Sequence, residues 1–150
     1  MGNRSSSSGF SIIELLWVIV LMGLMALLGI PRIRDALQKQ NVRGARVAAV
    51  AHVVKARNVA VQRGCRATVH LRSTGAIWVT ACRTAGTGLD TLGGMDNLYD
   101  RYGVTLSASR DSVQFDPRGL SLGNQSATIA FTNTLATDTI TINAVGRVVQ

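Results

Sequence analysis

The sequence predicts an α+β fold in which one long N-terminal helix packs on a small antiparallel β-sheet head. Three observations indicate this fold. Residues 10–30 are almost continuously apolar, helical periodicity continues to about Gln62–Gly64, and from Cys65 onward the pattern changes to a period of two. The chain has 150 residues, enough for one domain with a modest core. We therefore divide it into residues 1–9, 10–30, 31–64 and 65–150.

The composition excludes several classes of protein. Apolar residues make up 47% of the chain, which is too many for a disordered polypeptide. Two cysteines exclude a four-cysteine zinc site, and two histidines leave little material for acid–base or metal chemistry, so we expect no metal and no cofactor. The net charge of +8 comes from residues 32–83, which hold 11 basic residues and one acidic residue.

The apolar segment 10–30 is expected to span a membrane once. As a helix it would be roughly 30 Å long, which matches the hydrocarbon core of a bilayer. A secretory signal peptide would have a shorter apolar region and a small-x-small cleavage site, and a buried core helix would not be apolar on all sides. Only Arg4 precedes the segment and several basic residues follow it, so the positive-inside rule alone would place the head in the cytoplasm.

The junction at residues 9–16, Gly-Phe-Ser-Ile-Ile-Glu-Leu-Leu, resembles the prepilin motif of type IV pilins and type II secretion pseudopilins. The resemblance implies that residues 1–9 are a leader, that a prepilin peptidase cleaves after Gly9, and that Phe10 becomes N-methylated. It also implies a single span in the bacterial inner membrane, a periplasmic head, and a filament built from pilin subunits on an assembly platform. Gly23 and Pro31 fall where pilin helices carry a glycine and a proline.

Glu14 is the one charged residue of the apolar segment. A carboxylate is costly in lipid unless it is paired, and the new amine at Phe10 of a neighbouring chain is a suitable partner. The resemblance implies this pairing in a filament; the alternative is that Glu14 reaches the lipid headgroups. Pro31 lacks the amide hydrogen that would bond to the carbonyl of Leu27, so we expect a helix kink at Pro31, with added flexibility at Gly23.

The helix is expected to continue beyond Pro31 and to end near Gly64. The apolar residues that recur at helical spacing are Ile33, Leu37, Val47, Val50, Val54 and Val61. At 100° per residue, five basic residues fall within about 60° of one another. This basic stripe comprises Arg32, Lys39, Arg43, Arg46 and Arg57. It is interpreted as a solvated or headgroup-facing surface, with contacts to nucleic acid or to acidic neighbours in a filament as alternatives.

The head is expected to begin with a hairpin. Residues 67–72 and 76–82 alternate as strands around Ser73-Thr74-Gly75, which places Cys65 and Cys82 opposite each other at the open end. We expect a disulfide between them after export, with two buried thiols as the alternative. Five more strands are expected at residues 104–108, 112–115, 127–131, 139–143 and 145–149.

Residues 84–102 are expected to form a glycine-rich, solvated loop. The loop contains several side chains that are typical calcium ligands, namely Asp90, Asp96, Asn97 and Asp100. Their spacing fits no EF-hand, so calcium stays the weaker alternative.

Residues 56–64, 103–122 and 139–150 resemble the GspH/FimT group of minor pseudopilins and pilins. Members sit at or near filament tips, and some FimT-like members bind DNA through a C-terminal Gly-Arg-x-Arg turn. Here Gly146 and Arg147 match, but Val149 stands in place of the second arginine. The candidate DNA contacts are Arg147, Arg43 and Arg46.

Catalysis is not expected. Residues 119–123 match the G-x-S-x-G pattern, but no helix is expected after Ser121, and both His52 and His70 precede it. Arg118 is expected to be structural, pairing with Asp116 or Asp111. The sequence thus predicts a structural subunit of a type II secretion or type IV pilus filament, with a DNA-binding minor pilin for DNA uptake as the alternative.

Overall fold

The computed structural model describes residues 10–84, 86–123 and 126–149. These residues form two compact units, the first ending at Ala36 and the second beginning at Leu37. The elements in chain order are α1 (Ile12–Arg63), β1 (Ala67–Leu71), β2 (Ala76–Cys82), β3 (Leu89–Thr91), β4 (Asp96–Asn97), α2 (Leu98–Tyr102), β5 (Thr105–Ala108), β6 (Ser112–Phe115), β7 (Ala127–Thr132), β8 (Thr137–Ile142) and β9 (Val148–Val149).

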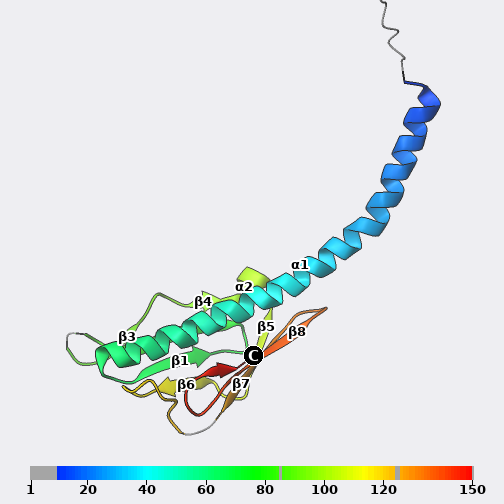
Figure 1. Ribbon diagram of the computed structural model, residues 1–150. Helices are drawn as coiled ribbons and strands as arrows, with labels where there is room; N and C mark the ends of the chain where they lie inside the picture. Colours follow the sequence, from blue (N-terminus) through cyan, green and yellow to red (C-terminus); the bar gives the residue numbers. More distant parts are fainter. Residues whose placement is uncertain (1–9, 85, 124–125, 150) are drawn as a thin grey trace, which may run out of the picture. The chain divides into compact units, whose positions relative to one another are not determined.

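The first unit contains the N-terminal part of α1. This helix is long and apolar enough to cross a membrane, judged by its length and composition. The second unit, which we call the head, contains the rest of α1 and all the strands. In Figure 1 this part of α1 runs alongside the strands of the head.

The head packs α1 on the sheets through small side chains. The buried residues of α1 recur every three or four positions and are Val42, Ala45, Ala49, Val53, Ala56 and Ala60. Alanine at most of these positions lets the strands approach the helix axis closely. The helix ends at Arg63, as predicted, and Gly64 follows with a φ of 61°. Such a left-handed conformation favours glycine and ends the helix.

The first sheet has the strand order β3-β2-β1-β6, and β4 pairs with β2. The predicted hairpin is confirmed, with Val69 paired with Val79 and Gly75 adopting a φ of 89° in the turn. Val69 also pairs with Val113 of β6 on its other side. Burial alternates along β1, so one face of this sheet lies in the core and the other points outward.

The second sheet has the order β5-β7-β8-β9. Its fully buried side chains complete the core and are Ile129, Phe131, Ile140 and Ile142. The strand expected at residues 145–149 is shorter than predicted. The side chain of Asn143 accepts hydrogen bonds from the amides of Val145 and Arg147, which forms a turn, and only Val148–Val149 pairs with β8.

The expectation of a loop at residues 84–102 is wrong. Leu89–Thr91 and Asp96–Asn97 extend the first sheet along β2, and Leu98–Tyr102 forms α2. The Asn97 side chain caps α2 by accepting from the amide of Tyr99, and Gly103 ends the helix with a φ of 63°. Leu98 is fully buried and anchors the segment in the core.

Candidate assembly surface

The N-terminal part of α1 has no partner among the residues that the structure describes. Every residue from Phe10 to Leu28 is exposed, and Phe10 itself is 78% exposed. Glu14 lies in the first turn of α1, and no ion pair involves it in the part of the chain that the structure describes. Gly9, the predicted cleavage position, lies outside the described residues. Such an apolar helix needs lipid or other helices around it.

Gly23 and Pro31 both lie inside α1. A Cβ atom at Gly23 would meet nothing within 4 Å, so no described part of this chain requires a glycine there. Pro31 has no amide hydrogen to donate to the preceding turn, which weakens the helix locally. The kink at these residues stays a prediction.

The head part of α1 also presents apolar side chains to solvent. Leu37, Val47, Val54 and Val61, which we call the outer stripe, are 57%, 61%, 45% and 52% exposed. Leu37 and Val47 lie on the side of the helix away from the buried residues, whereas Val54 and Val61 directly follow buried Val53 and Ala60 and lie roughly 100° around the helix from them. Val54 also lines a cavity with Gly146, so this end of the outer stripe flanks the core face. The predicted helical spacing is therefore confirmed, but most of its residues lie outside the core.

The basic stripe of α1 does not form one uniform surface. Arg46 makes an ion pair with Asp138, at 3.2 Å between Nη1 and Oδ2. Arg43 lines a groove of about 690 Å³ beside Tyr102, whose ring lies against Gly44. A Cβ on Gly44 would approach this ring to 2.8 Å. Of the predicted DNA contacts, Arg46 is thus already paired and Arg43 belongs to a separate groove.

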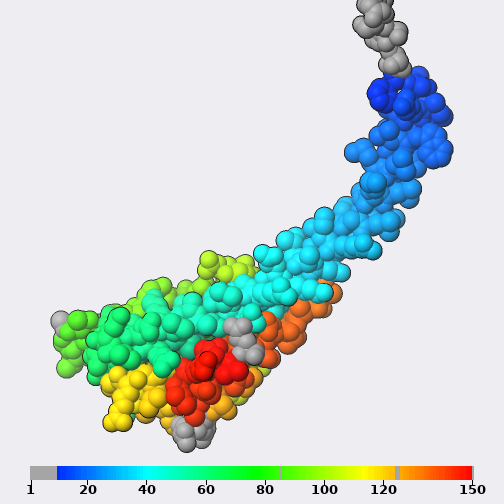
Figure 2. Space-filling model, viewed as in Figure 1, coloured from blue at the N-terminus to red at the C-terminus, as the bar shows by residue number. Residues whose placement is uncertain are grey.

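Arg147 lies beside a basic residue of α1. A cavity of about 360 Å³ is lined by Arg57, Asn58, Gly146 and Arg147, among others. Gly146 has a φ of 75°, and a Cβ there would come within 2.9 Å of the Gly119 carbonyl oxygen. Figure 2 shows the C-terminal segment, in red, against the helix of the head. The structure therefore places Arg57 and Arg147 on the lining of one cavity, an association that the sequence pattern did not reveal.

The turn at Gly119 lies against both the turn at Gly146 and the side chain of Arg57. A Cβ on Gly119 would lie 3.1 Å from Arg57 Nε. No ion pair involves Arg57 or Arg147 among the described residues. Asp116 does not pair with the Arg118 side chain as expected; its carboxylate accepts from the backbone amides of Arg118 and Leu120. Both arginines beside the cavity thus keep their donors available for an anion.

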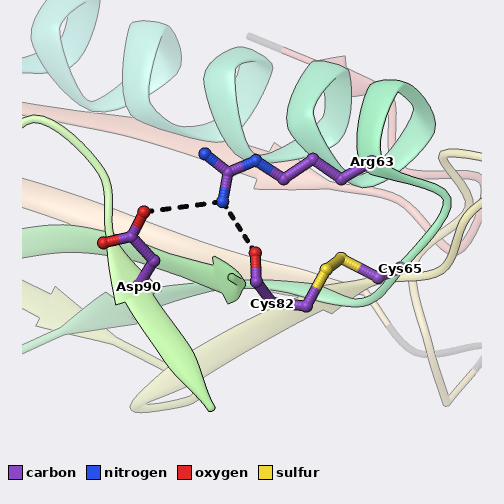
Figure 3. Close-up of a disulfide and its surroundings, with 4 residues drawn as sticks. All are labelled: Arg63, Cys65, Cys82 and Asp90. Carbon is purple, nitrogen blue, oxygen red and sulfur yellow. Dashed lines mark hydrogen bonds and ion pairs between the residues drawn. A yellow bond between two sulfur atoms is a disulfide. The ribbon is translucent and has the colours of Figure 1, made fainter. Parts of the chain in front are cut away.

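The predicted disulfide between Cys65 and Cys82 is present, with 6.2 Å between the Cα atoms (Figure 3). It joins the end of α1 to the end of β2. Arg63 reinforces this junction because its Nη1 donates to the Cys82 carbonyl oxygen at 2.6 Å and lies 3.6 Å from Asp90 Oδ2. This role of Arg63 was not predicted, although a cation in the last helical turn is a recognised signal for carbonyl contacts.

The acidic side chains of residues 84–102 contact α1 or neighbouring side chains of the same segment. Asp90 pairs with Arg63, and Asp96 lies 3.4 Å from Arg101 and 3.6 Å from His52. Asp100 accepts a hydrogen bond from the side chain of Asn97. Lys55, which the sequence analysis did not single out, donates to the Leu92 carbonyl oxygen. These contacts tie the segment to α1.

The G-x-S-x-G match does not form a nucleophile elbow. Ser121 is buried and bridges to Phe115 in a β-arrangement, where an elbow would lead into a helix. His70 Nε2 lies 2.9 Å from Thr80 Oγ1, and His52 contacts Asp96. Each histidine thus has a local structural partner on its own part of the head.

Residues 48–146 match the family described as Type II transport protein GspH. A crystal structure of the type IV minor pilin FimU from Pseudomonas aeruginosa PAO1 matches with a TM-score of 0.60 at 13% identity, covering 73% of this chain and 87% of that chain. A second crystal form of FimU matches with a TM-score of 0.53 at 13% identity and covers 73% and 89%. No curated protein matches the sequence significantly. The shared architecture is a long N-terminal helix packed on antiparallel sheets.

Proposed function

The chain belongs to the GspH family, and we propose that it is a minor pseudopilin or minor pilin that initiates or caps a type II secretion or type IV pilus filament. Proteins of this family are structural subunits, and the single apolar N-terminal helix fits a membrane-anchored one. The head would lie in the periplasm, on the outer side of the bacterial inner membrane. The observation that supports this proposal best is the apolar surface of α1 that this chain leaves uncovered.

That surface has two parts, and both suit assembly with other pilin subunits. The exposed segment from Phe10 to Leu28 requires an apolar environment, which lipid provides before assembly and neighbouring helices provide afterwards. The outer stripe adds apolar area on the head, where lipid would not reach. Burying one valine side chain contributes roughly 1.5–3 kcal/mol, so several such residues together favour association.

Glu14 would fix the register between subunits. After a prepilin peptidase cleaves behind Gly9, the amine of Phe10 becomes the chain's N-terminus, and its charge would compensate a neighbour's Glu14 carboxylate. The Phe10 amine and the Glu14 carboxylate are four residues apart near the start of α1. Pairing the amine of one subunit with the carboxylate of the next would therefore displace the two helices along the filament axis. Methylation of the Phe10 amine retains its positive charge.

The test uses a zero-length cross-linker. The full chain is co-produced with a prepilin peptidase, and the membranes are treated with a hydrophobic carbodiimide, which converts a carboxylate–amine pair into an amide. We expect the mature chain to begin at Phe10 and a cross-linked peptide to join Phe10 to Glu14 of another copy. Glu14→Gln should abolish this product, and the matched control Asp35→Asn should retain it. A chain that still begins at Met1, or an unchanged product in Glu14→Gln, would overturn the proposal.

A DNA-uptake minor pilin is the second candidate, and the pairing of Arg57 with Arg147 favours it. The motif lacks its second arginine at Val149, but Arg57 supplies a second guanidinium beside the same cavity. Two unpaired arginines from different segments would suit a phosphate backbone.

Double-stranded DNA binding by the full chain in micelles, measured over a salt series, tests this second function. Arg57→Gln and Arg147→Gln should each lower the log–log salt slope by roughly 0.9, because each removes one phosphate contact. Arg46→Gln should leave the slope unchanged, since Arg46 is paired with Asp138. Binding that is absent at low salt, or that depends equally on Arg46, would exclude the Arg57–Arg147 site.

A further inference from the structure

The outward face of the first sheet carries an aromatic pair that neither the fold nor the assembly surface explains. His70 and Trp78 are register partners on β1 and β2, and their rings stack with centroids 4.9 Å apart and planes 11° apart. Their strand neighbours Val69 and Val79 point into the core, so the two rings point away from it. The chain has only two tryptophans, and the other, Trp17, lies in the membrane-spanning segment.

The pair borders a cavity with polar groups. The cavity has a volume of about 460 Å³, and its lining includes His70, Arg72, Ser73, Trp78, Asp111 and Ser112. This size lies within the range of small-molecule sites. The Arg72 guanidinium carbon lies 5.9 Å from the centroid of the Trp78 ring. The lining thus combines an aromatic wall with hydroxyl, guanidinium and carboxylate groups.

The charges of this lining balance. Arg72 is the one cation and Asp111 the one anion, because burial, with a smaller effect of the Arg72 charge, lowers the pKa of His70 and keeps its imidazole neutral at pH 7. No ion pair joins Arg72 to Asp111 among the described residues, so both can bind a ligand. A groove for nucleic acid would instead carry an excess of positive charge.

We propose that the cavity bordered by Trp78 and His70 binds a neutral saccharide. The ring atoms of Trp78 and His70 that border the cavity, outside the faces the two rings stack against each other, would contact the C–H groups of a pyranose ring through contacts of the weak hydrogen-bond type. Arg72 donates to hydroxyl oxygens, Asp111 accepts from hydroxyl hydrogens, and Ser73 and Ser112 do either. A small number of oriented polar groups on an aromatic surface is typical of such ligand sites. This site is separate from α1 and does not depend on the assembly role.

The fluorescence of Trp78 tests the proposal directly. In the full chain with Trp17→Phe, Trp78 is the sole tryptophan, and the chain is held in a zwitterionic detergent without a sugar headgroup. The probes are maltotriose, tri-N-acetylchitotriose and a single-stranded oligonucleotide. We expect a saturable change in Trp78 emission with at least one trisaccharide, at a dissociation constant on the order of 1 mM or below. Saturation-transfer NMR should show contact with the C–H protons of the same sugar.

Two variants and a matched control identify the site. Arg72→Gln and Asp111→Asn should each weaken trisaccharide binding at least tenfold, since each removes charge-assisted hydrogen bonds. Arg66→Gln changes an exposed arginine outside this cavity and should bind like the parent. Three results would overturn the proposal: no saturable change up to about ten times the expected constant, equal binding by the Arg72 and Asp111 variants, or a response to the oligonucleotide alone.

Discussion

Removal of the Cys65–Cys82 disulfide should destabilise the head by about 3 kcal/mol. The bond closes a loop with a sequence separation of 17 residues. In the chain-entropy treatment, a loop of this length restricts the unfolded state by about 3 kcal/mol at 25 °C. Arg63 still bonds the Cys82 carbonyl oxygen in Cys65→Ala/Cys82→Ala, since that oxygen belongs to the backbone. The folded head should therefore keep its structure, and the loss should come from the unfolded state.

Urea unfolding of the full chain in micelles measures this loss. Trp78 in the Trp17→Phe background reports on the head alone, because the rest of the chain then holds no tryptophan. With an urea m-value of roughly 1–3 kcal/mol/M, the midpoint should fall by about 1–3 M. The parent under a reducing agent should unfold at the same midpoint as the double variant.

A loss below about 1 kcal/mol would refute the loop-closure reasoning, because it would mean that the unfolded chain keeps the two ends together without the bond. A reduced parent that is much more stable than the double variant would show instead that the alanine side chains disturb the folded junction.

Further predictions concern four single residues. Gly44→Leu should cost about 1–3 kcal/mol of unfolding free energy, since its side chain must displace the ring of Tyr102; urea unfolding checks this. Phe131→Ala should cost about 3–5 kcal/mol by opening a cavity in the core, whereas exposed Val54→Ala should change stability by less than about 0.5 kcal/mol. If the outer stripe contacts other subunits, Val54→Ala should nevertheless reduce the yield of the Phe10–Glu14 cross-linked product. His70 has a folded-state pKa below its ordinary value of 6.5, so the unfolded chain binds the proton first and stability should fall as the pH drops below about 6.5. His70→Asn should remove that part of the pH dependence, and an unchanged slope would contradict the assignment to His70.

Local sequence signals located most of the elements. The end of α1 before Gly64 and the hairpin around Gly75 follow from backbone chemistry that acts over a few residues. The same holds for the disulfide, because a hairpin of known turn position fixes which residues lie opposite each other. The strands within residues 84–102 were not predicted, since they are short and form only by pairing with β2. The many glycines of this segment favoured the prediction of a loop.

Some candidate sites could likewise be predicted from the sequence, and others are formed only by tertiary packing. Glu14 stands out from the sequence because a carboxylate inside an apolar run is costly wherever the chain folds, and the resemblance to the prepilin motif singles out Phe10. Arg57 and Arg147 are far apart in sequence, and only the packing of two glycine turns against α1 brings them to one cavity. Helical spacing likewise placed the valines of α1 on a face, but it could not decide whether that face is covered.

The amino-acid sequence was enough to predict the membrane-type helix, the start and end of the first hairpin, and the family to which the chain belongs. These properties depend on local periodicity, on glycine turns and on motifs, all of which lie within short windows. The tertiary structure alone decided which face of α1 is buried, which arginines are paired and which aromatic rings border a cavity. Those outcomes depend on contacts between distant segments, and the sheets pack on a face of α1 that is made mostly of small alanines, together with Val42 and Val53.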